Sequence, residues 1–350
     1  MGAQRLRVAV ATPLPADLAA FLRGAEPRIE LLHEPDLLPP MRHPADFGGD
    51  PSFRRSPDQQ ERFERLLADA DALYGVPDLD AAALRRAVAA NPGLRWVHTM
   101  AAGGGSQVKA ASLTEEQLVR VRFTTSAGVH GAPLAEFAVL GVLAGAKDLG
   151  RLRTQQRRHE WSDRFEMRQV QGSRVLVVGL GGIGRVVAAR LAGLGADVVG
   201  VARRPVPVDG VSAVLPPDRI VEAARGADAI VATLPGTDAT TGLIGRAVLD
   251  AASRGVTVVN VGRGTVIDEQ ELVAALLDGR VGFAALDVFE TEPLDPASPL
   301  WDLDTVLISP HTAGLTHDEE RRIAELFADN ATRLLDGLPL RNLVDTVEFY

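Results

Sequence analysis

The stretch RVLVVGLGGIGRVVAARLAGL, residues 174–194, decides the fold of this chain. An apolar strand-like run ends at a G-x-G-x-x-G pattern, and a helical pattern follows it. The first glycine permits a tight turn, the second lets the backbone approach a pyrophosphate, and the third allows close packing of helix on strand. An ordinary glycine-rich turn is the alternative interpretation. The flanking strand and helix favour a dinucleotide-binding loop made of Gly179, Leu180, Gly181, Gly182, Ile183 and Gly184.

The same alternation of strands and helices continues on both sides of this loop. Downstream, the strand-like runs are DVVGVARR, DAIVATLP, VTVVNVG, VGFAALDVF and TVLISPH, with helical stretches between most of them. Apolar strands joined by helices predict a parallel sheet covered on both faces. Upstream, the alternation from RLRVAVAT to LRWVHTM predicts a second domain of the same class. We therefore expect an α/β protein with two Rossmann-like domains and parallel sheets.

Two helical patterns predict how the domains are connected. GAPLAEFAVLGVLAGAKDL, starting near Pro133, is a long apolar helix that we expect between the domains. The final pattern, HDEERRIAELFADNATRLLDG, is expected to return the chain to the first domain. The prediction is a substrate domain of residues 1–126 and 315–350, with a dinucleotide-binding domain of residues 127–314 inserted into it. The cleft between two domains is where a ligand is expected.

Two polar segments interrupt the pattern. Residues 38–62 are rich in proline, glycine and charge and predict a long loop. Packing or a subunit contact is the favoured role for this loop, with substrate contact as the alternative. The stretch RLRTQQRRHEWSDRFEMRQVQG, residues 151–172, is polar and basic and predicts a solvated connection into the second domain.

Composition restricts the class of function. The chain has 350 residues, of which 46% are hydrophobic, enough for two cores of ordinary size. Its net charge of -9 argues against a general role on nucleic acid or on a membrane surface, because broad phosphate binding needs a basic excess. The absence of cysteine excludes disulfides, thiolate metal sites and cysteine nucleophiles. The first residues lack a long apolar run, so we expect a cytoplasmic protein, and we predict no metal site.

The end of the second strand of the dinucleotide domain predicts which cofactor is preferred. About 20 residues after the glycine loop, a fold selective for NAD usually presents Asp or Glu to the ribose. Here Ala202 occupies that position, and Arg203 and Arg204 follow it. Guanidinium groups can pair with a 2'-phosphate, which predicts NADP as the preferred cofactor with NAD possible. Two arginines on an exposed loop without a ligand are the alternative.

Three short segments further along carry the residues for catalysis. NVGRG contains Arg263, LDVFETEP contains Glu292, and SPHTAG contains His311. An arginine can bind a carboxylate, a histidine can transfer a proton, and a carboxylate can hold that histidine in its charged form. Alone, each has an ordinary explanation as a surface arginine, a structural histidine or a salt-bridged glutamate. Their order behind the glycine loop predicts a hydride-transfer site.

With these motifs in place, the sequence resembles the D-isomer-specific 2-hydroxyacid dehydrogenases, which include glyoxylate and hydroxypyruvate reductases and phosphoglycerate dehydrogenase. The resemblance covers most of the chain and is strongest from Gly179 to Gly314. It implies a reversible reduction of a small 2-oxo acid to the D-2-hydroxy acid by NAD(P)H. In that reaction Arg263 binds the substrate carboxylate and polarises the carbonyl, His311 is the general acid and base, and Glu292 pairs with His311.

The resemblance also implies further cofactor contacts. Pro235 and Thr240 are expected to line the cofactor cleft, and Val261 to contact the nicotinamide through its backbone. Asp287 matches a carboxylate near the nicotinamide end, although a role as a strand-end cap is the alternative.

On the substrate side, WVHTMAAGGGSQV resembles the segment whose backbone N–H groups hold the substrate carboxylate. Ala102, Gly103 and Gly104 fall on that match, with a flexible linker as the alternative. Gly105 stands where many members have Asp, which leaves the range of substrates open. Trp96, on the preceding strand, is expected in the core.

The sequence also bears on related dehydrogenase activities, on a non-catalytic function and on the assembly state. Formate dehydrogenases usually carry Gln at the position of Glu292, and phosphite dehydrogenase uses a lysine near the small-residue loop. Here the nearest lysine, Lys109, comes several residues too late. A dinucleotide-binding corepressor or scaffold with little turnover is the alternative of a different class. A homodimer, formed through the nucleotide domain, is implied by the resemblance.

Overall fold

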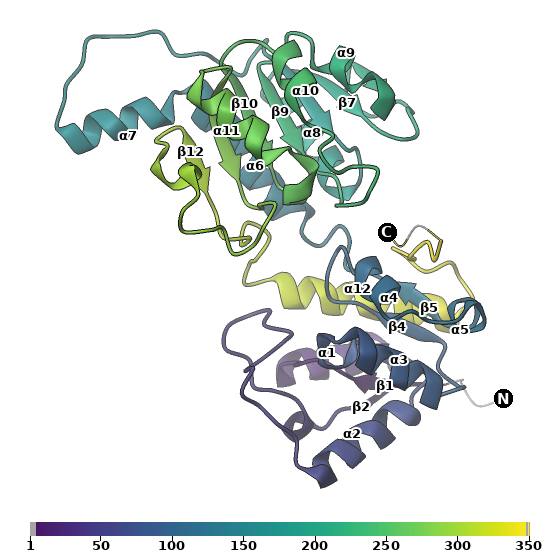
Figure 1. The fold of residues 1–350 in the computed structure, drawn as a ribbon. Coiled ribbons are helices and arrows are strands. Elements are labelled where there is room, and N and C mark those ends of the chain that lie inside the picture. The colour runs from purple at the N-terminus through teal and green to yellow at the C-terminus, as the bar shows by residue number, and fades with distance from the viewer. Residues whose placement is uncertain (1–4, 348, 350) are drawn as a thin grey trace. The chain divides into compact units, whose positions relative to one another are not determined.

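The computed structural model describes residues 5–347 and residue 349, and these divide into two compact units (Figure 1). Unit 1 contains the chain up to His130 and again from Leu315, and unit 2 is Gly131–Gly314. Each unit has one sheet of parallel strands accompanied by helices. The predicted α/β class, with two Rossmann-like domains of which one is inserted into the other, is confirmed.

Unit 1 is built on a five-stranded sheet with the order β2-β1-β3-β4-β5. Its strands are β1 (Leu6–Val10), β2 (Ile29–Leu32), β3 (Ala72–Tyr74), β4 (Trp96–His98) and β5 (Arg122–Thr124). Its helices are α1 (Ala16–Ala25), α2 (Pro57–Ala68), α3 (Ala81–Ala90), α4 (Gly105–Ala110), α5 (Glu115–Arg120) and α12 (Glu319–Leu335), with short 3-10 turns at Pro35–Leu37 and Pro77–Leu79.

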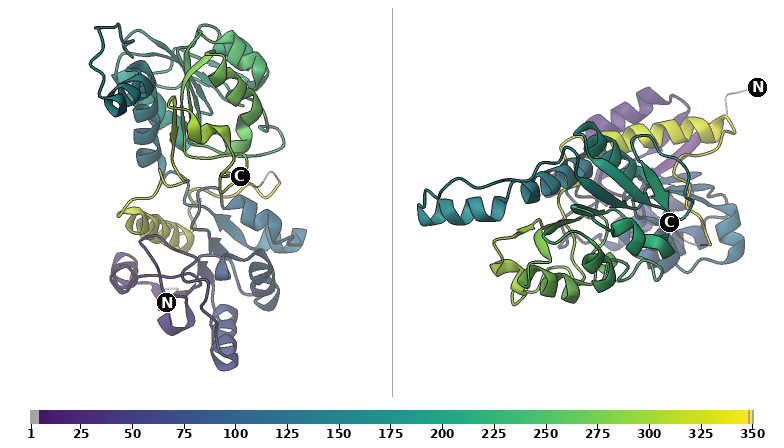
Figure 2. Two further views of the ribbon diagram at one scale, coloured as in Figure 1. Left: turned by 60° about the vertical axis from the view of Figure 1, so that its left-hand side comes forward. Right: turned by 90° about the horizontal axis from the view of Figure 1, so that it is seen from above.

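Helix α12 returns the end of the chain to the core of unit 1, as predicted. Figure 2 shows it alongside α1. Phe327 of α12 is fully buried, and its ring stacks on that of Trp96 with centroids 4.4 Å apart. The Tyr74 ring meets Phe327 edge to face at 5.0 Å. These aromatic contacts place Trp96 in the core, as expected, and connect two segments far apart in sequence.

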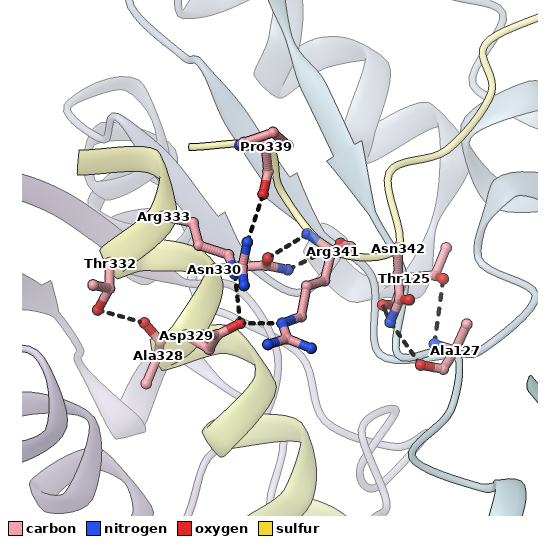
Figure 3. Close-up of polar contacts among 10 residues, drawn as sticks. All are labelled: Thr125, Ala127, Ala328, Asp329, Asn330, Thr332, Arg333, Pro339, Arg341 and Asn342. Atoms are coloured by element: carbon pink, nitrogen blue, oxygen red, sulfur yellow. Dashed lines mark hydrogen bonds and ion pairs between the residues drawn. The ribbon is translucent and has the colours of Figure 1, made fainter. Parts of the chain in front are cut away.

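The segment after α12 is held by a compact set of polar contacts (Figure 3). Asp329 accepts hydrogen bonds from both Arg333 and Arg341 at 2.9 and 2.6 Å. The buried Asn330 side chain accepts from the backbone N–H of Arg341 and donates to its carbonyl oxygen. Asn342 then donates to the carbonyl oxygens of Thr125 and Ala127. The chain after α12 is therefore joined to the segment that follows β5.

A buried histidine in β4 is satisfied as a neutral ring. The Trp96 indole donates to Thr124 Oγ1, and Thr124 Oγ1 lies 2.8 Å from His98 Nδ1. His98 Nε2 lies 3.1 Å from Ser126 Oγ, which in turn donates to the carbonyl oxygen of Thr99. Every polar hydrogen in this chain of contacts has an acceptor when His98 carries one proton, on Nε2. Complete burial lowers the pKa of His98 to about 3, from an ordinary value of 6.5.

The low pKa of His98 predicts that the free energy of unfolding decreases as the pH falls. Below pH 6.5 the unfolded chain binds a proton at His98, whereas the folded chain does so only near pH 3. The His98 contribution is therefore complete above pH 6.5 and decreases by about 1.4 kcal/mol per pH unit as the pH falls through that window. Urea unfolding of the His98→Gln variant should show a shallower loss of stability between pH 7 and about pH 5 than the parent. Equal pH slopes for the two proteins would contradict this account.

Unit 2 is built on a seven-stranded sheet with the order β12-β11-β10-β9-β6-β7-β8. Its strands are β6 (Arg174–Val178), β7 (Asp197–Val201), β8 (Ala213–Leu215), β9 (Ala229–Ala232), β10 (Val256–Asn260), β11 (Val281–Leu286) and β12 (Val306–Ile308). Its helices are α6 (Gly131–Ala146), α7 (Leu149–Arg158), α8 (Gly182–Gly193), α9 (Ile220–Ala224), α10 (Arg246–Ala251) and α11 (Glu269–Leu277), with 3-10 turns at Pro217–Arg219, Gly264–Val266 and Pro299–Asp302. Among the residues described, no helix has the length and apolar character needed to span a membrane.

Two of the predicted irregular segments are partly helical. The expected loop over residues 38–62 ends at Ser56, because α2 begins at Pro57. Ser56 accepts a hydrogen bond from the Gln59 backbone, and the Gln59 side chain accepts one from the Ser56 backbone. The sequence Ser-Pro-Asp-Gln has the pattern of a capping box, which predicts the start of a helix. Likewise, the expected connection over 151–172 is helical up to Arg158, because its Leu, Arg and Gln residues favour a helix.

Candidate active site

The glycine loop of unit 2 has the stereochemistry that its sequence predicts. Gly179 has a φ of +99°, where a side chain would be strained. A Cβ on Gly184 would lie 1.8 Å from the carbonyl oxygen of Gly179, so the helix can approach the strand only with glycine there. A Cβ on Gly181 would meet nothing within 4 Å, which leaves open space beside the backbone. The loop leads into α8, whose first residue is Gly182. This arrangement fits a dinucleotide pyrophosphate.

The strand order of unit 2 brings the other candidates to the same edge of the sheet. Strands β6 and β9 are neighbours in the sheet. From β6 the strands continue outward in the order β7 and β8, and from β9 they continue on the other side in the order β10, β11 and β12. Ligands of such sheets bind outside the carboxyl ends of the strands at this switch point. Gly179 follows β6, Val261 follows β10 and Asp287 follows β11. All therefore lie at the carboxyl edge, with Val261 and Asp287 buried.

The remaining cofactor candidates occupy loops at that edge. Arg203 and Arg204 come directly after β7 and Ala202, and both are exposed. Thr240 Oγ1 donates to the carbonyl oxygen of Pro235 at 2.7 Å, which closes the loop after β9. Leu180 is buried, and Ile183 is half-buried in α8.

Arg263 stands on a loop whose shape is set by its neighbours. The buried Asn260, at the end of β10, donates to the carbonyl oxygen of Arg263 and accepts from the N–H of Gly262. A Cβ on Gly264 would lie 1.8 Å from the carbonyl carbon of Phe289, so the Arg263 loop packs directly on the loop that follows β11. Asn260 was not among the expected site residues, although a buried strand that ends in a polar residue before Val-Gly-Arg-Gly is a signal for it.

His311 and Glu292 form a direct pair. The distance from His311 Nδ1 to Glu292 Oε2 is 2.7 Å. The other carboxylate oxygen of Glu292 accepts a hydrogen bond from the backbone N–H of Phe289 at 3.0 Å, which fixes the carboxylate. The two side chains are 49% and 36% exposed, so the pair is accessible to a ligand. With Nδ1 engaged by the carboxylate, Nε2 is the ring nitrogen positioned to exchange a proton.

The structure does not bring every predicted site residue into one contact set. Within residues 5–347, no hydrogen bond or ion pair connects Arg263 to either His311 or Glu292, although all three stand on loops at one edge of unit 2. Ala102, Gly103 and Gly104 belong to unit 1, in the turn between β4 and α4. A Cβ on Gly104 would lie 1.7 Å from Thr99 Oγ1, so close packing explains this glycine. Gly105 is the first residue of α4.

Comparison with known families and curated proteins gives a consistent set of similarities. The model of the NAD binding domain of D-isomer specific 2-hydroxyacid dehydrogenases matches residues 139–313. The chain is 33% identical over 273 residues to D-3-phosphoglycerate dehydrogenase of Mycobacterium leprae, covering 76% of this chain and 51% of that protein. It is 33% identical over 222 residues to hydroxyphenylpyruvate reductase of Plectranthus scutellarioides, covering 63% and 70%. The chain thus spans about half the length of the phosphoglycerate dehydrogenases that it matches.

Solved structures resemble the whole chain. A D-isomer specific 2-hydroxyacid dehydrogenase from Xanthobacter autotrophicus, crystallised with NADPH and MES, is 28% identical, with a TM-score of 0.78 and coverage of 99% of this chain and 100% of that one. An NADPH-dependent glyoxylate/hydroxypyruvate reductase from Sinorhizobium meliloti, in complex with NADP and sulfate, has a TM-score of 0.77 at 23% identity, covering 99% and 100%, and shares the fold.

Proposed function

The chain belongs to the D-isomer specific 2-hydroxyacid dehydrogenase family, and from that premise we propose that it reversibly reduces a small 2-oxo acid to the D-2-hydroxy acid with NADP as preferred cofactor. The observation that carries the proposal is the 2.7 Å pair of His311 and Glu292 at the carboxyl edge of unit 2. The Arg263 loop, packed on the loop that leads to Glu292, supplies the neighbouring cation.

The proposed chemistry assigns a separate task to each residue. When bound, a reduced dinucleotide supplies the hydride equivalent for the carbonyl carbon. The Arg263 guanidinium donates paired hydrogen bonds to the substrate carboxylate, and its charge favours the developing alkoxide. His311 donates a proton from Nε2 to the carbonyl oxygen, and in the reverse direction Nε2 accepts the hydroxyl proton. Glu292 orients the ring through the bond at Nδ1.

Further residues are proposed to contact the cofactor and the substrate. The glycine loop would hold the pyrophosphate against the α8 amino terminus, because the open space at Gly181 allows close approach. Pro235, Thr240, Val261 and Asp287 are proposed along the rest of the cofactor site. The backbone of Ala102, Gly103 and Gly104 is proposed to bind the substrate carboxylate.

Preference for NADP rests on Arg203 and Arg204. Both are exposed just beyond β7, where an NAD-selective protein would present a carboxylate. The NADPH in the Xanthobacter autotrophicus relative supports the same choice. Replacing both arginines with serine should lower the ratio of kcat/KM for NADPH to that for NADH by about tenfold to a hundredfold, the equivalent of one charge-assisted bond to the 2'-phosphate at roughly 1.5 to 3 kcal/mol.

Initial rates with the two cofactors test this preference. Arg254→Ser is the matched control, because Arg254 precedes β10 at the opposite edge of the sheet and donates to the carbonyl oxygen of Asp278. The control should leave the ratio unchanged. An unchanged ratio in the double variant would show that another group reads the 2'-phosphate.

The activity itself is tested with a panel of 2-oxo acids. Purified protein is mixed with NADPH or NADH and with glyoxylate, hydroxypyruvate, pyruvate or phenylpyruvate, and loss of the reduced cofactor is followed by absorbance. Turnover of at least one acid, with the D-hydroxy acid identified by chiral chromatography, is the expected result. Cofactor binding without any turnover would instead favour the corepressor or scaffold class.

We further propose a homodimer formed through unit 2. Helix α7 and the segment after it project away from the rest of unit 2 (Figure 2). Trp161 on this segment is fully exposed, and aromatic side chains on a protruding surface are enriched at contacts between protein chains. Sedimentation velocity should therefore give twice the mass of the chain.

A further inference from the structure

Asp287 is connected to the catalytic histidine segment by a concentrated set of hydrogen bonds. It follows β11, and only 1% of its surface is exposed. Its Oδ1 accepts from Ser309 Oγ at 2.6 Å and from the backbone N–H groups of Thr312 and Ala313 at 2.9 and 3.0 Å. Its backbone oxygen accepts from the N–H of His311 at 2.9 Å. One residue therefore receives hydrogen bonds from four residues of a five-residue segment.

The backbone at the centre of this segment is in an unusual conformation. His311 has a φ of +52°, in the left-handed region that residues with a side chain seldom adopt. Such a conformation costs of order 1 to 3 kcal/mol and persists when the surrounding contacts determine it. The donors to Asp287 lie on both sides of His311 and include its own N–H. They close a turn with His311 at its apex, and the ring projects to Glu292.

We propose that Asp287 is a positioning residue, which holds His311 in the left-handed turn and so sets the His311 ring against Glu292. The hydrogen bonds to its side chain converge on Oδ1, and all come from the segment that carries the histidine. This role differs from the cofactor contact proposed above, which depends on affinity for the dinucleotide. The inference rests on the proposed function, because it assigns Asp287 to the geometry of the proton-transfer step.

Two replacements of Asp287 distinguish the effect of losing its negative charge from the effect of losing its hydrogen-bond acceptor. Asp287→Asn keeps an oxygen that can accept from Ser309, Thr312 and Ala313, so kcat should stay within about tenfold of the parent. Asp287→Ala removes the acceptor and frees the turn, and kcat should fall on the order of a hundredfold, as a displacement of about 1 Å at a reacting group does. Rescue by Asn is the expected signature of an acceptor that shapes the backbone. An equal loss of kcat in both variants would overturn the proposal.

A double-mutant cycle tests whether Asp287 acts through His311. In a His311→Gln background, adding Asp287→Ala should lower kcat by less than about twofold, because the group that it positions is already absent. A second hundredfold loss in that background would contradict the positioning role. The dissociation constant for NADPH, measured by fluorescence titration, should rise by a smaller factor in Asp287→Ala than kcat falls, because the positioning role acts on the proton-transfer step in addition to the proposed cofactor contact. A large rise in this constant, with kcat at saturation restored, would assign the residue to cofactor binding instead.

A matched control and a structural readout separate this inference from the proposed function. Asp228 also holds backbone in unit 2, since it accepts from the N–H of Arg174 at 3.0 Å, but it lies at the amino edge of the sheet. Asp228→Ala should leave kcat unchanged. A crystal structure of Asp287→Ala should show His311 outside the left-handed region or its ring away from Glu292, and an unmoved His311 would refute the proposal even if no 2-oxo acid were turned over. If the geometry changes as expected while the parent has no turnover, only the proposed function fails.

Discussion

Replacing His311 with glutamine is expected to lower kcat by about 10²-fold to 10⁴-fold, because the variant has no group that can give a proton to the carbonyl oxygen. Glutamine keeps a polar side chain of similar reach, so packing changes little. The ring nitrogen that contacts Glu292 at 2.7 Å is lost, but the glycine loop is untouched. Binding of NADPH should therefore remain near that of the parent. Initial rates at saturating substrate and a fluorescence titration of NADPH measure the two quantities separately.

The chain offers a close control for this variant. His317 is another exposed histidine next to a carboxylate, with its Nε2 at 3.2 Å from Asp318. It belongs to unit 1 and is not among the residues proposed for the site. His317→Gln should leave kcat unchanged. Full activity in the His311 variant, or an equal loss in both variants, would remove the assignment of His311 as general acid and base.

Replacing Arg263 is expected to reduce kcat/KM for the 2-oxo acid by about 10²-fold to 10³-fold, the usual cost of losing a donor aimed at a developing oxyanion. Lysine at this position keeps the charge but lacks the planar pair of donors, so Arg263→Lys should remain strongly impaired. The loop itself should persist, because Asn260 holds it through the backbone of Arg263 and Gly262.

Added guanidinium ion provides a direct check on the Arg263 assignment. It should partly restore turnover in Arg263→Ala, because it can occupy the vacated space and donate the same paired bonds, and it should do nothing for Arg263→Lys. Arg280→Lys is the control, since Arg280 pairs with Asp278 and Asp250 just before β11, at the opposite edge of the sheet. A parent-like kcat/KM in Arg263→Lys would show that charge alone suffices and that bidentate binding is not used.

The sequence by itself determined the class of fold and the nature of unit 2, because those signals depend on local stereochemistry. The φ of Gly179 and the contact of Gly184 with the preceding strand follow from residues five positions apart. Apolar runs alternating with helical patterns predict parallel sheets in the same way. The order of the motifs around Arg263, Glu292 and His311 was likewise enough to expect the family, and the match over residues 139–313 agrees with it.

Local sequence signals also account for the two segments, residues 38–62 and 151–172, that were expected to be irregular and are partly helical. The start of α2 was encoded in the capping box at Ser56, but proline, glycine and charge in the preceding residues dominated the prediction of a loop. Residues after Leu149 continue as a helix because helix propensity outweighs their polarity. Both helices are therefore specified by local sequence and do not depend on tertiary contacts.

Only the tertiary structure decided which polar groups meet. The pairing of Asp287 with Ser309, Thr312 and Ala313 joins residues 22 to 26 positions apart. The chain from Trp96 through Thr124 to His98 depends equally on the register of β4 beside β5. A residue type predicts what bonds a side chain can make, whereas the packing of distant segments selects the partner that it meets. A sequence of this kind therefore determines the fold and names the candidates for catalysis, while the folded chain decides how each one is held.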